Sequence, residues 1–132
     1  MKIGIPKESL SDEARVAGSP DNVKKLISLG AEVTIQSGAG DKSSFRDSQY
    51  KEAGAKIAKS RSELLKNSDI VLCVRAPSDS DIKSMKKGAL LIGILNPYSN
   101  ESVLKSCADK GVVAMAMELV PRITRAQSMD VL

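Results

Sequence analysis

Short runs of apolar residues alternate with amphipathic segments along this chain. Three runs are almost continuously apolar and are bounded by turn-forming residues: Ile70–Val74, Ala89–Leu95 and Val112–Met117. Such runs are typical of strands that are buried on both faces of a parallel sheet. Two weaker runs, Lys2–Ile5 and Ala31–Gln36, predict two more strands, and Ala55–Ala58 is a candidate for a sixth.

Helical patterns fall between these predicted strands. The clearest covers Ser19–Leu29. Ser19 is suited to the N-cap, Pro20 to the first helical position and Gly30 to the carboxyl-terminal cap. A second helix is predicted over Asn100–Lys110. Shorter helices are predicted over Asp47–Ala53, Ser60–Asn67 and Asp79–Lys87.

This strand–helix alternation predicts an α/β fold, a doubly wound and mostly parallel sheet with helices on both faces, as in Rossmann-like and flavodoxin-like three-layer domains. The carboxyl ends of all parallel strands then lie along one edge, where such folds bind ligands. The segments that follow the predicted strands at this edge are Pro6–Glu8, Ser37–Gly40, Arg75–Pro77, Asn96–Asn100 and Glu118–Arg122. They are rich in cations and amides.

Composition narrows the possible functions. The length of 132 residues suits a single domain, and only 2% of the residues are aromatic, which argues against base-stacking platforms for nucleic acid. The chain contains no histidine, so the usual general base and most zinc chemistry are excluded, and we expect no metal site. Cys73 and Cys107 are expected to be two buried, reduced thiols. The net charge of +4 is spread along the chain and predicts no nucleic-acid partner.

The hydrophobic pattern predicts neither a signal peptide nor a transmembrane segment. The amino terminus lacks the pattern of a signal peptide, because Pro6 and Lys7 interrupt its first apolar stretch. The longest apolar run, Ala89–Leu95, is far shorter than the roughly 20 residues that span a bilayer. We therefore expect a water-soluble chain without a transmembrane segment.

Several edge segments carry candidate chemistry. Gly38-Ala39-Gly40 follows a strand as a phosphate-binding loop would, but Ser43 replaces the third glycine, so a plain turn is favoured. Arg15 and Arg75 could face an anionic ligand across the edge or could simply be solvated. Asn96 and Tyr98 follow the most hydrophobic strand, where they could contact a ligand or tie down the turn.

The densest polar segment is Pro121–Asp130, directly after the last predicted strand. It contains two guanidinium groups, a carboxamide and a carboxylate. Arginine can hold a phosphate or a carbonyl group, and Gln127 can exchange paired hydrogen bonds with another carboxamide. From spacing alone, a ligand-binding loop and the polar start of a helix are equally good interpretations.

At these residues the chain resembles a known family. The matching stretches are KIGIPKE (Lys2–Glu8), RVAGSP (Arg15–Pro20), the SGAG loop, VRAPSD (Val74–Asp79), LIGILNPYSN (Leu91–Asn100) and PRITRAQSMD (Pro121–Asp130). Together they resemble the amino-terminal part of the alpha subunit of proton-translocating NAD(P) transhydrogenase, and more distantly the corresponding part of alanine dehydrogenase.

The resemblance implies a set of site residues. It places Gln127 and Asp130 in a catalytic role beside the nicotinamide ring. It also implies that the loop binds the cofactor NAD(H) through Arg122, Ile123, Thr124, Arg125, Gln127 and Asp130.

The resemblance further implies the setting of the reaction, hydride transfer from NADH to NADP⁺ coupled to proton translocation. The expected partners are the remainder of the alpha subunit, an NADP(H)-binding component and a membrane component. A homodimer at the cytoplasmic side of the bacterial inner membrane is also implied. Residues 1–132 correspond to one amino-terminal domain, without the classical dinucleotide-binding domain, so we expect the isolated chain to be inactive.

Three residues allow a comparison with the active site of alanine dehydrogenase. Arg15 agrees with the substrate-binding arginine of that family, but Arg75 replaces its catalytic lysine and Asn96 its catalytic histidine. These replacements argue against amino-acid oxidation. The alternatives to a transhydrogenase are an alanine dehydrogenase-like fragment and a non-catalytic interaction module.

Overall fold

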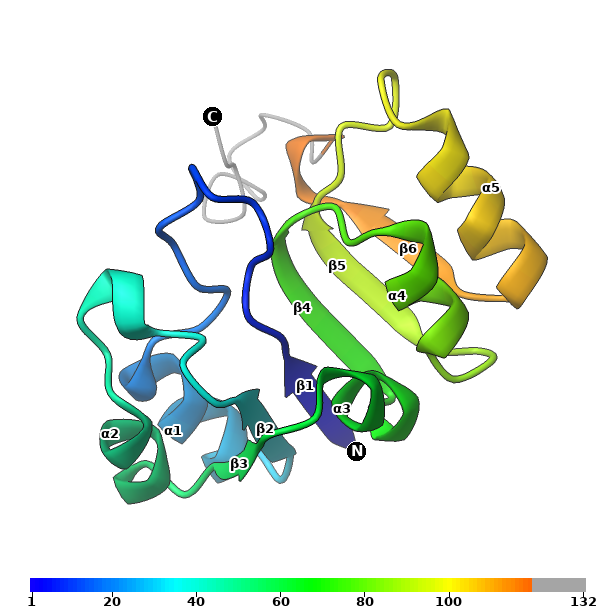
Figure 1. Cartoon of the computed structure of the whole chain (residues 1–132). Helices are drawn as coiled ribbons and strands as arrows, with labels where there is room; N and C mark the ends of the chain where they lie inside the picture. The colour runs from blue at the N-terminus through cyan, green and yellow to red at the C-terminus, as the bar shows by residue number, and fades with distance from the viewer. Residues whose placement is uncertain (120–132) are drawn as a thin grey trace, which may run out of the picture.

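The computed structural model describes residues 1–119, which form one six-stranded sheet. The strands are β1 (Lys2–Ile5), β2 (Glu32–Gln36), β3 (Lys56–Ala58), β4 (Ile70–Arg75), β5 (Leu90–Ile94) and β6 (Val113–Ala116) (Figure 1). All neighbours pair in parallel, in the order β3-β2-β1-β4-β5-β6. The predicted doubly wound α/β fold is therefore confirmed, and the sixth candidate run is a strand.

Five α-helices connect the strands. They are α1 (Pro20–Ser28), α2 (Asp47–Glu52), α3 (Arg61–Asn67), α4 (Asp79–Ser84) and α5 (Glu101–Lys110), with the 3₁₀ turns η1 (Asp41–Ser43) and η2 (Met117–Leu119). Successive strands run outward from β1 to β3, and then from β4 to β6 in the opposite direction. Right-handed crossovers consequently place α1 and α2 on one face of the sheet and α3, α4 and α5 on the other.

The core has two halves that follow from this layout. One lies under α1 and α2 and includes Ile5, Val23, Ile35 and Tyr50. The other lies under α3, α4 and α5 and consists of these buried residues: Leu64, Leu65, Val71, Cys73, Ile82, Met85, Ala89, Leu91, Leu95, Val103, Cys107 and Val112. Helix α3 also packs on β1, β2 and β3 from the side opposite α1 and α2, so this half of the sheet has helices on both faces, whereas α4 and α5 lie together on one face of the other half.

The start of α1 shows how local sequence sets an element. The Ser19 hydroxyl accepts a hydrogen bond from the Asn22 backbone N–H at 3.2 Å, and Pro20 occupies the first helical position. Gly30 has a φ of 100°, a left-handed conformation that glycine adopts without steric cost. The predicted capping of this helix is confirmed.

Two elements differ from the sequence-based expectation. Helix α4 ends at Ser84 rather than Lys87, because Met85 is extended and buries its side chain in the core. Strand β6 lies at the sheet edge, where Val113 is 60% and Met115 47% exposed. The expectation that this strand is buried on both faces is therefore wrong within residues 1–119.

Cys73 and Cys107 are both buried and free, as expected. Burial raises the pKa of each thiol above its ordinary value, which disfavours the reactive thiolate. Among residues 1–119, no helix is both long and apolar enough to cross a membrane.

Candidate functional site

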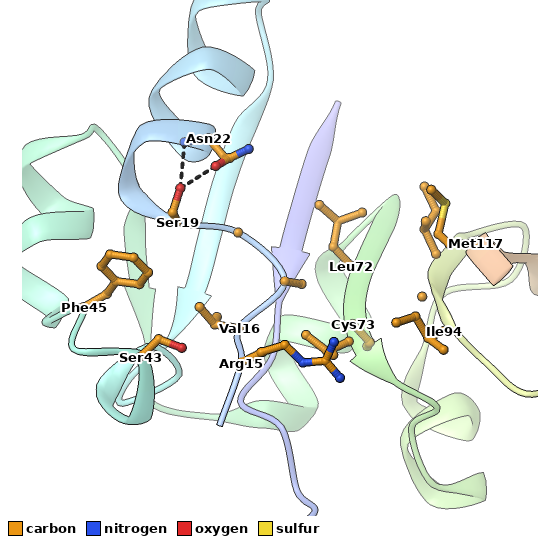
Figure 2. A pocket seen from close by; sticks show the side chains of 15 residues that line it. Arg15, Val16, Ser19, Asn22, Ser43, Phe45, Leu72, Cys73, Ile94 and Met117 are labelled. Atoms are coloured by element: carbon orange, nitrogen blue, oxygen red, sulfur yellow. Dashed lines mark hydrogen bonds between the residues drawn. The ribbon is translucent and has the colours of Figure 1, made fainter. Parts of the chain in front are cut away.

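A crevice of about 530 Å³ opens where the strand order reverses, between β1 and β4. Ligands bind at this position in open α/β sheets because the connections from the two neighbouring strands turn in opposite directions. Its lining comes from the segment before α1 and the first turn of α1, from η1 and the turn after it, from strands β4 and β5, and from η2. In Figure 2, Arg15 and Val16 face Ile94 and Met117 across this crevice.

The crevice has an apolar floor and a polar rim. Leu72, Ile92 and Ile94 from the sheet supply aliphatic surface, whereas Ser19 and Asn22 supply a hydroxyl and an amide at the start of α1. This combination suits a flat, partly polar ring better than a small, highly charged ion.

Arg15 lies at the rim of the crevice and forms an ion pair with Glu13 that includes three hydrogen bonds. Its Nε donates to Glu13 Oε2 at 2.9 Å and its Nη2 to Glu13 Oε1 at 2.8 Å, while the Arg15 backbone N–H also donates to Oε2 at 3.0 Å. Hydrogen bonding from Arg15 is the main cause that lowers the pKa of Glu13 to about 2, with a smaller contribution from Arg75. Glu13 is 5% exposed and Arg15 61%, so a buried carboxylate anchors a guanidinium that reaches solvent.

Arg75, at the end of β4, approaches the same carboxylate. Its Nη1 lies 4.0 Å from Glu13 Oε1, and its Nη2 lies 3.9 Å from an oxygen of the exposed Asp12. The structure thus brings Arg15 and Arg75 together around Glu13. One of the two positive charges is balanced by the buried carboxylate.

A second cavity, of about 600 Å³, lies at the carboxyl ends of β4 and β5. Its lining includes Arg75, Asn96, Asn100 and Glu118. Asn96 has a φ of 48°, a left-handed conformation that is uncommon for a residue other than glycine. Arg75 and Asn96 therefore line the same cavity at the carboxyl ends of the strands, and their role toward a ligand stays a prediction.

Two carboxylates fix these strand ends in the same manner. Glu8 accepts the backbone N–H groups of Val74 at 3.0 Å and Arg75 at 2.8 Å. Glu118 accepts those of Leu95 at 3.2 Å and Asn96 at 2.6 Å. Each carboxylate satisfies two donors that the strand ladder leaves free.

Two other sequence candidates lie elsewhere. Tyr98 is 85% exposed and lines neither cavity, so the structure does not bring it to the site. The glycine loop is filled by the protein itself, because Gly38 N–H and the Ser37 hydroxyl both donate to the Asp47 carboxylate, at 3.0 and 2.6 Å. The hydroxyl of Ser37, followed by the Gly38 N–H, lowers the pKa of Asp47. The interpretation of this loop as a plain turn is confirmed.

Sequence reasoning assigned no role to Glu13, Glu8, Glu118 or Arg61. Arg61 donates to both oxygens of Asp81, at 2.9 and 2.8 Å, and joins the starts of α3 and α4. No periodic pattern marks these residues: Glu8, Glu118 and Arg61 act on partners from other segments, and Glu13 pairs with Arg15 in an irregular segment. The only available signal was an acidic residue beside a strand end or beside an arginine.

The remaining candidates lie outside the described residues. These are Arg122, Ile123, Thr124, Arg125, Gln127 and Asp130. Their roles at the nicotinamide ring stay predictions. Within residues 1–119, no cluster of three or more histidine, cysteine or acidic side chains is arranged to hold a metal ion.

Comparison with known sequences shows similarity along the whole chain. NAD(P) transhydrogenase subunit alpha of Cereibacter sphaeroides is 42% identical over 132 residues, which are 100% of this chain and 25% of that protein. An NAD(P) transhydrogenase alpha-subunit polypeptide of Rhodospirillum rubrum is 42% identical over 137 aligned positions, covering 100% of this chain and 36% of that protein. Alanine dehydrogenase of Staphylococcus epidermidis is 38% identical over 120 residues, 91% of this chain and 32% of that enzyme. The chain spans only about a quarter to a third of the length of these relatives.

Solved structures of a transhydrogenase and an alanine dehydrogenase are also similar to this chain. Transhydrogenase from Sinorhizobium meliloti superposes with a TM-score of 0.94 at 45% identity, over 98% of this chain and 39% of that one. An L-alanine dehydrogenase superposes with a TM-score of 0.88 at 30% identity, over 95% of this chain and 34% of that one. The family described as "Alanine dehydrogenase/PNT, N-terminal domain" matches residues 4–132. The resemblance seen in the sequence is confirmed, and the chain belongs to the alanine dehydrogenase/PNT N-terminal domain family.

Proposed function

We propose that this chain is the nicotinamide-facing domain of an NAD(H)-binding transhydrogenase alpha subunit. In the complete subunit it would help to transfer hydride from NADH to NADP⁺, with proton translocation by the rest of the complex. The observation that carries the proposal is the pair Arg75 and Asn96 at the strand ends. A guanidinium stays protonated at any physiological pH and a carboxamide does not titrate, so neither side chain offers a proton.

This lack of a proton donor separates two reaction classes. Oxidation of an amino acid requires proton transfer at the reacting nitrogen and carbonyl groups. Hydride transfer between two nicotinamide rings requires alignment and exclusion of water instead. The apolar floor of Leu72, Ile92 and Ile94 supports the second class, because such a surface excludes water from one side of a bound ring.

The described residues fit one end of a dinucleotide but not its pyrophosphate. A glycine-rich turn after β1 would normally bind the phosphates. Here β1 is followed by Glu8, Asp12 and Glu13, and the glycine loop after β2 is occupied by Asp47. In the proposal, bound NADH supplies the hydride and is held mainly by another region of the longer subunit, while Arg122, Gln127 and Asp130 position its ring.

The proposal also includes the wider assembly. The remainder of the alpha subunit, an NADP(H)-binding component and a membrane component would be the partners, and the subunit would act as a homodimer beside the bacterial inner membrane. The alpha-subunit names of the relatives support this assignment, as does the small share of their length that this chain covers.

The test uses a complete subunit in which this chain replaces the matching amino-terminal segment of the Rhodospirillum rubrum protein. Gln127→Ala and Asp130→Ala should each slow hydride transfer about 10-fold or more and weaken NADH binding less, because groups at the ring position the reacting carbon. Arg122→Ala should affect both quantities. Lys105→Ala, an exposed change on α5, is the control. Normal turnover in the Gln127 and Asp130 variants would remove those residues from the site.

An alanine dehydrogenase-like activity is the second candidate, because Arg15 reaches the crevice and an L-alanine dehydrogenase shares the fold at 30% identity. The same complete subunit can be supplied with pyruvate, ammonium and NADH. We expect no reduction of pyruvate. Rapid reduction would favour this second candidate over the transhydrogenase.

A further inference from the structure

The two central strands of the sheet, β1 and β4, are paired over only a short stretch (Figure 1). Ile3 pairs with Ile70 and Gly4 with Val71, whereas β4 continues to Arg75. Within the described residues, this last part of β4 pairs with β5 and not with β1. Side chains, rather than a backbone ladder, therefore connect the end of β4 to the segment that follows β1.

Glu8 is one of these side chains, since its carboxylate accepts the two backbone N–H groups at the end of β4. The backbone just before it is held at both of its polar groups. The Lys7 N–H donates to Gln36 Oε1 at 2.8 Å, and the Lys7 carbonyl accepts a hydrogen bond from Nη1 of Arg61. The position of Glu8 thus depends on contacts from β2 and from the start of α3.

The Arg61 guanidinium joins this backbone to a third element. Its Nε and Nη2 donate to the two carboxylate oxygens of Asp81 in α4, at 2.9 and 2.8 Å, while Nη1 also donates to Gln36 Oε1 at 3.1 Å. The side chains of Arg61 and Asp81 are only 25% and 13% exposed, so water screens their charges little. One guanidinium therefore connects the segment after β1, the end of β2 and the start of α4.

The segments that Arg61 connects form two walls of the second cavity. Ser9 and Leu10 follow Glu8 on one side, and residues 75–78, which lead from β4 into α4, lie on the other. Arg61 itself lines neither this cavity nor the crevice. Any effect that it has on a ligand there is consequently exerted through its neighbours.

We propose that Arg61 is a positioning residue for this cavity. It fixes the Lys7 backbone against α4, and Glu8 thereby holds the end of β4 and the Arg75 guanidinium in place. Arginine suits this role because its planar group donates two parallel hydrogen bonds to a carboxylate and still has a donor for other acceptors. The consequence for hydride transfer rests on the function proposed above, in which the reaction depends on alignment.

The end of the neighbouring strand supplies a matched control. Glu118 accepts the N–H groups of Leu95 and Asn96 at the end of β5, just as Glu8 accepts those at the end of β4. Among the described residues, no hydrogen bond joins Arg61 to Glu118 or to β5. A general loss of stability should affect both strand ends, whereas loss of the Arg61 contacts should affect only β4.

The test is amide hydrogen exchange in the 132-residue chain, followed by NMR. In Arg61→Gln, the amides of Val74 and Arg75 should exchange at least about 10-fold faster, while those at the end of β5 change less than about 2-fold. Arg46→Gln, a change at an exposed arginine, should alter neither pair. Unchanged exchange at Val74 and Arg75, or equal acceleration at both strand ends, would overturn the proposal.

A second variant guards against a failure to fold. Arg61→Gln leaves the Asp81 carboxylate without its ion-pair partner, and removing one member of a largely buried pair is costly. The double variant Arg61→Gln/Asp81→Asn leaves no unpaired charge and still lacks the hydrogen bond to the Lys7 carbonyl. The same comparison of the two strand ends applies to it, with the same two outcomes.

Turnover in the complete subunit built with the Rhodospirillum rubrum sequence tests the consequence for the reaction. Arg61→Gln should slow hydride transfer about 10-fold and change the dissociation constant of NADH less than about 2-fold, because alignment is lost rather than binding. Faster exchange at Val74 and Arg75 with normal turnover would overturn a positioning role in the reaction. A wild-type complete subunit that transfers no hydride would contradict the proposed function, whereas the exchange rates alone decide whether Arg61 holds the end of β4.

Discussion

At the scale of single residues, Glu13 is the least expected feature of this domain. Its carboxylate is buried in the segment before α1 and receives three hydrogen bonds from Arg15, with Arg75 from β4 at 4.0 Å. It thereby links two segments that lie far apart in the sequence. The link holds Arg15 at the crevice and Arg75 at the second cavity around one carboxylate, which balances one of their two positive charges.

Glu13 should make the stability of the domain depend on acid. Its pKa is about 2 in the folded protein and near 4.5 when free, so its stabilising effect is complete above about pH 4.5 and is lost as the pH falls toward 2. Glu13→Gln should lower the free energy of unfolding at pH 7 by about 1–2 kcal/mol, a value reduced because Arg15 is largely exposed to solvent. The difference from wild type should disappear near pH 2.

Urea unfolding between pH 7 and pH 2.5 measures this effect. The control is Asp12→Asn, since Asp12 is 77% exposed and only 3.9 Å from Arg75. The same pH slope in wild type and Glu13→Gln would show that the carboxylate is not anchored as described.

At the scale of elements, the sequence predicted most of the fold because three strands lie in almost continuously apolar runs and the helices carry local signals. Ser19, Pro20 and Gly30 specify α1 within one stretch of chain. The early end of α4 escaped prediction because Met85 is drawn into a core made by distant elements. The local sequence pattern indicates which helix or strand a segment can form, whereas tertiary packing determines the residue at which that element ends.

The carboxylates at the strand ends are a second case in which local sequence does not reveal a long-range contact. Glu8 acts on Arg75, which is 67 positions away, and Glu118 acts on Asn96, 22 positions away. Both glutamates belong to edge segments that the sequence picked out, but their function is visible only when the strands are aligned.

Loss of the Glu118 carboxylate should therefore weaken the end of β5. Glu118→Ala leaves the N–H groups of Leu95 and Asn96 without their acceptor, and Leu95 is only 1% exposed. The free energy of unfolding should fall by about 1–3 kcal/mol. Glu118→Gln, which keeps one acceptor oxygen, should lose less.

Urea unfolding again provides the measurement, with Glu52→Ala on the exposed surface of α2 as the control. That control should stay within about 0.5 kcal/mol of wild type. An equally small effect of Glu118→Ala would mean that water replaces the carboxylate at no cost.

At the scale of the whole molecule, the edge where ligands bind could be predicted from strand order alone. Arg75 and Asn96 line one cavity there because the carboxyl ends of β4 and β5 lie side by side, and Arg15, from the segment before α1, lines the neighbouring crevice. Their contacts with a ligand stay predictions. Tyr98, a possible ligand-facing residue from the sequence, is 85% exposed and lines neither cavity, so its contact with a ligand stays a prediction. Side-chain direction in a turn depends on backbone angles such as the left-handed φ of Asn96, which the residue types do not specify.

The isolated chain should bind NADH weakly, with a dissociation constant in the millimolar range or above, and should have no transhydrogenase activity. The Glu13 carboxylate offsets some of the positive charge of Arg15 and Arg75, and Asp47 fills the glycine loop, so the described residues offer the pyrophosphate little. Hydrogen bonds from the Arg122–Asp130 segment would add about 1 kcal/mol each. That is too little to offset the several kcal/mol of translational and rotational freedom lost on association. Calorimetric titration of NADH decides the matter, because a dissociation constant in the low micromolar range would place the main dinucleotide site within this domain.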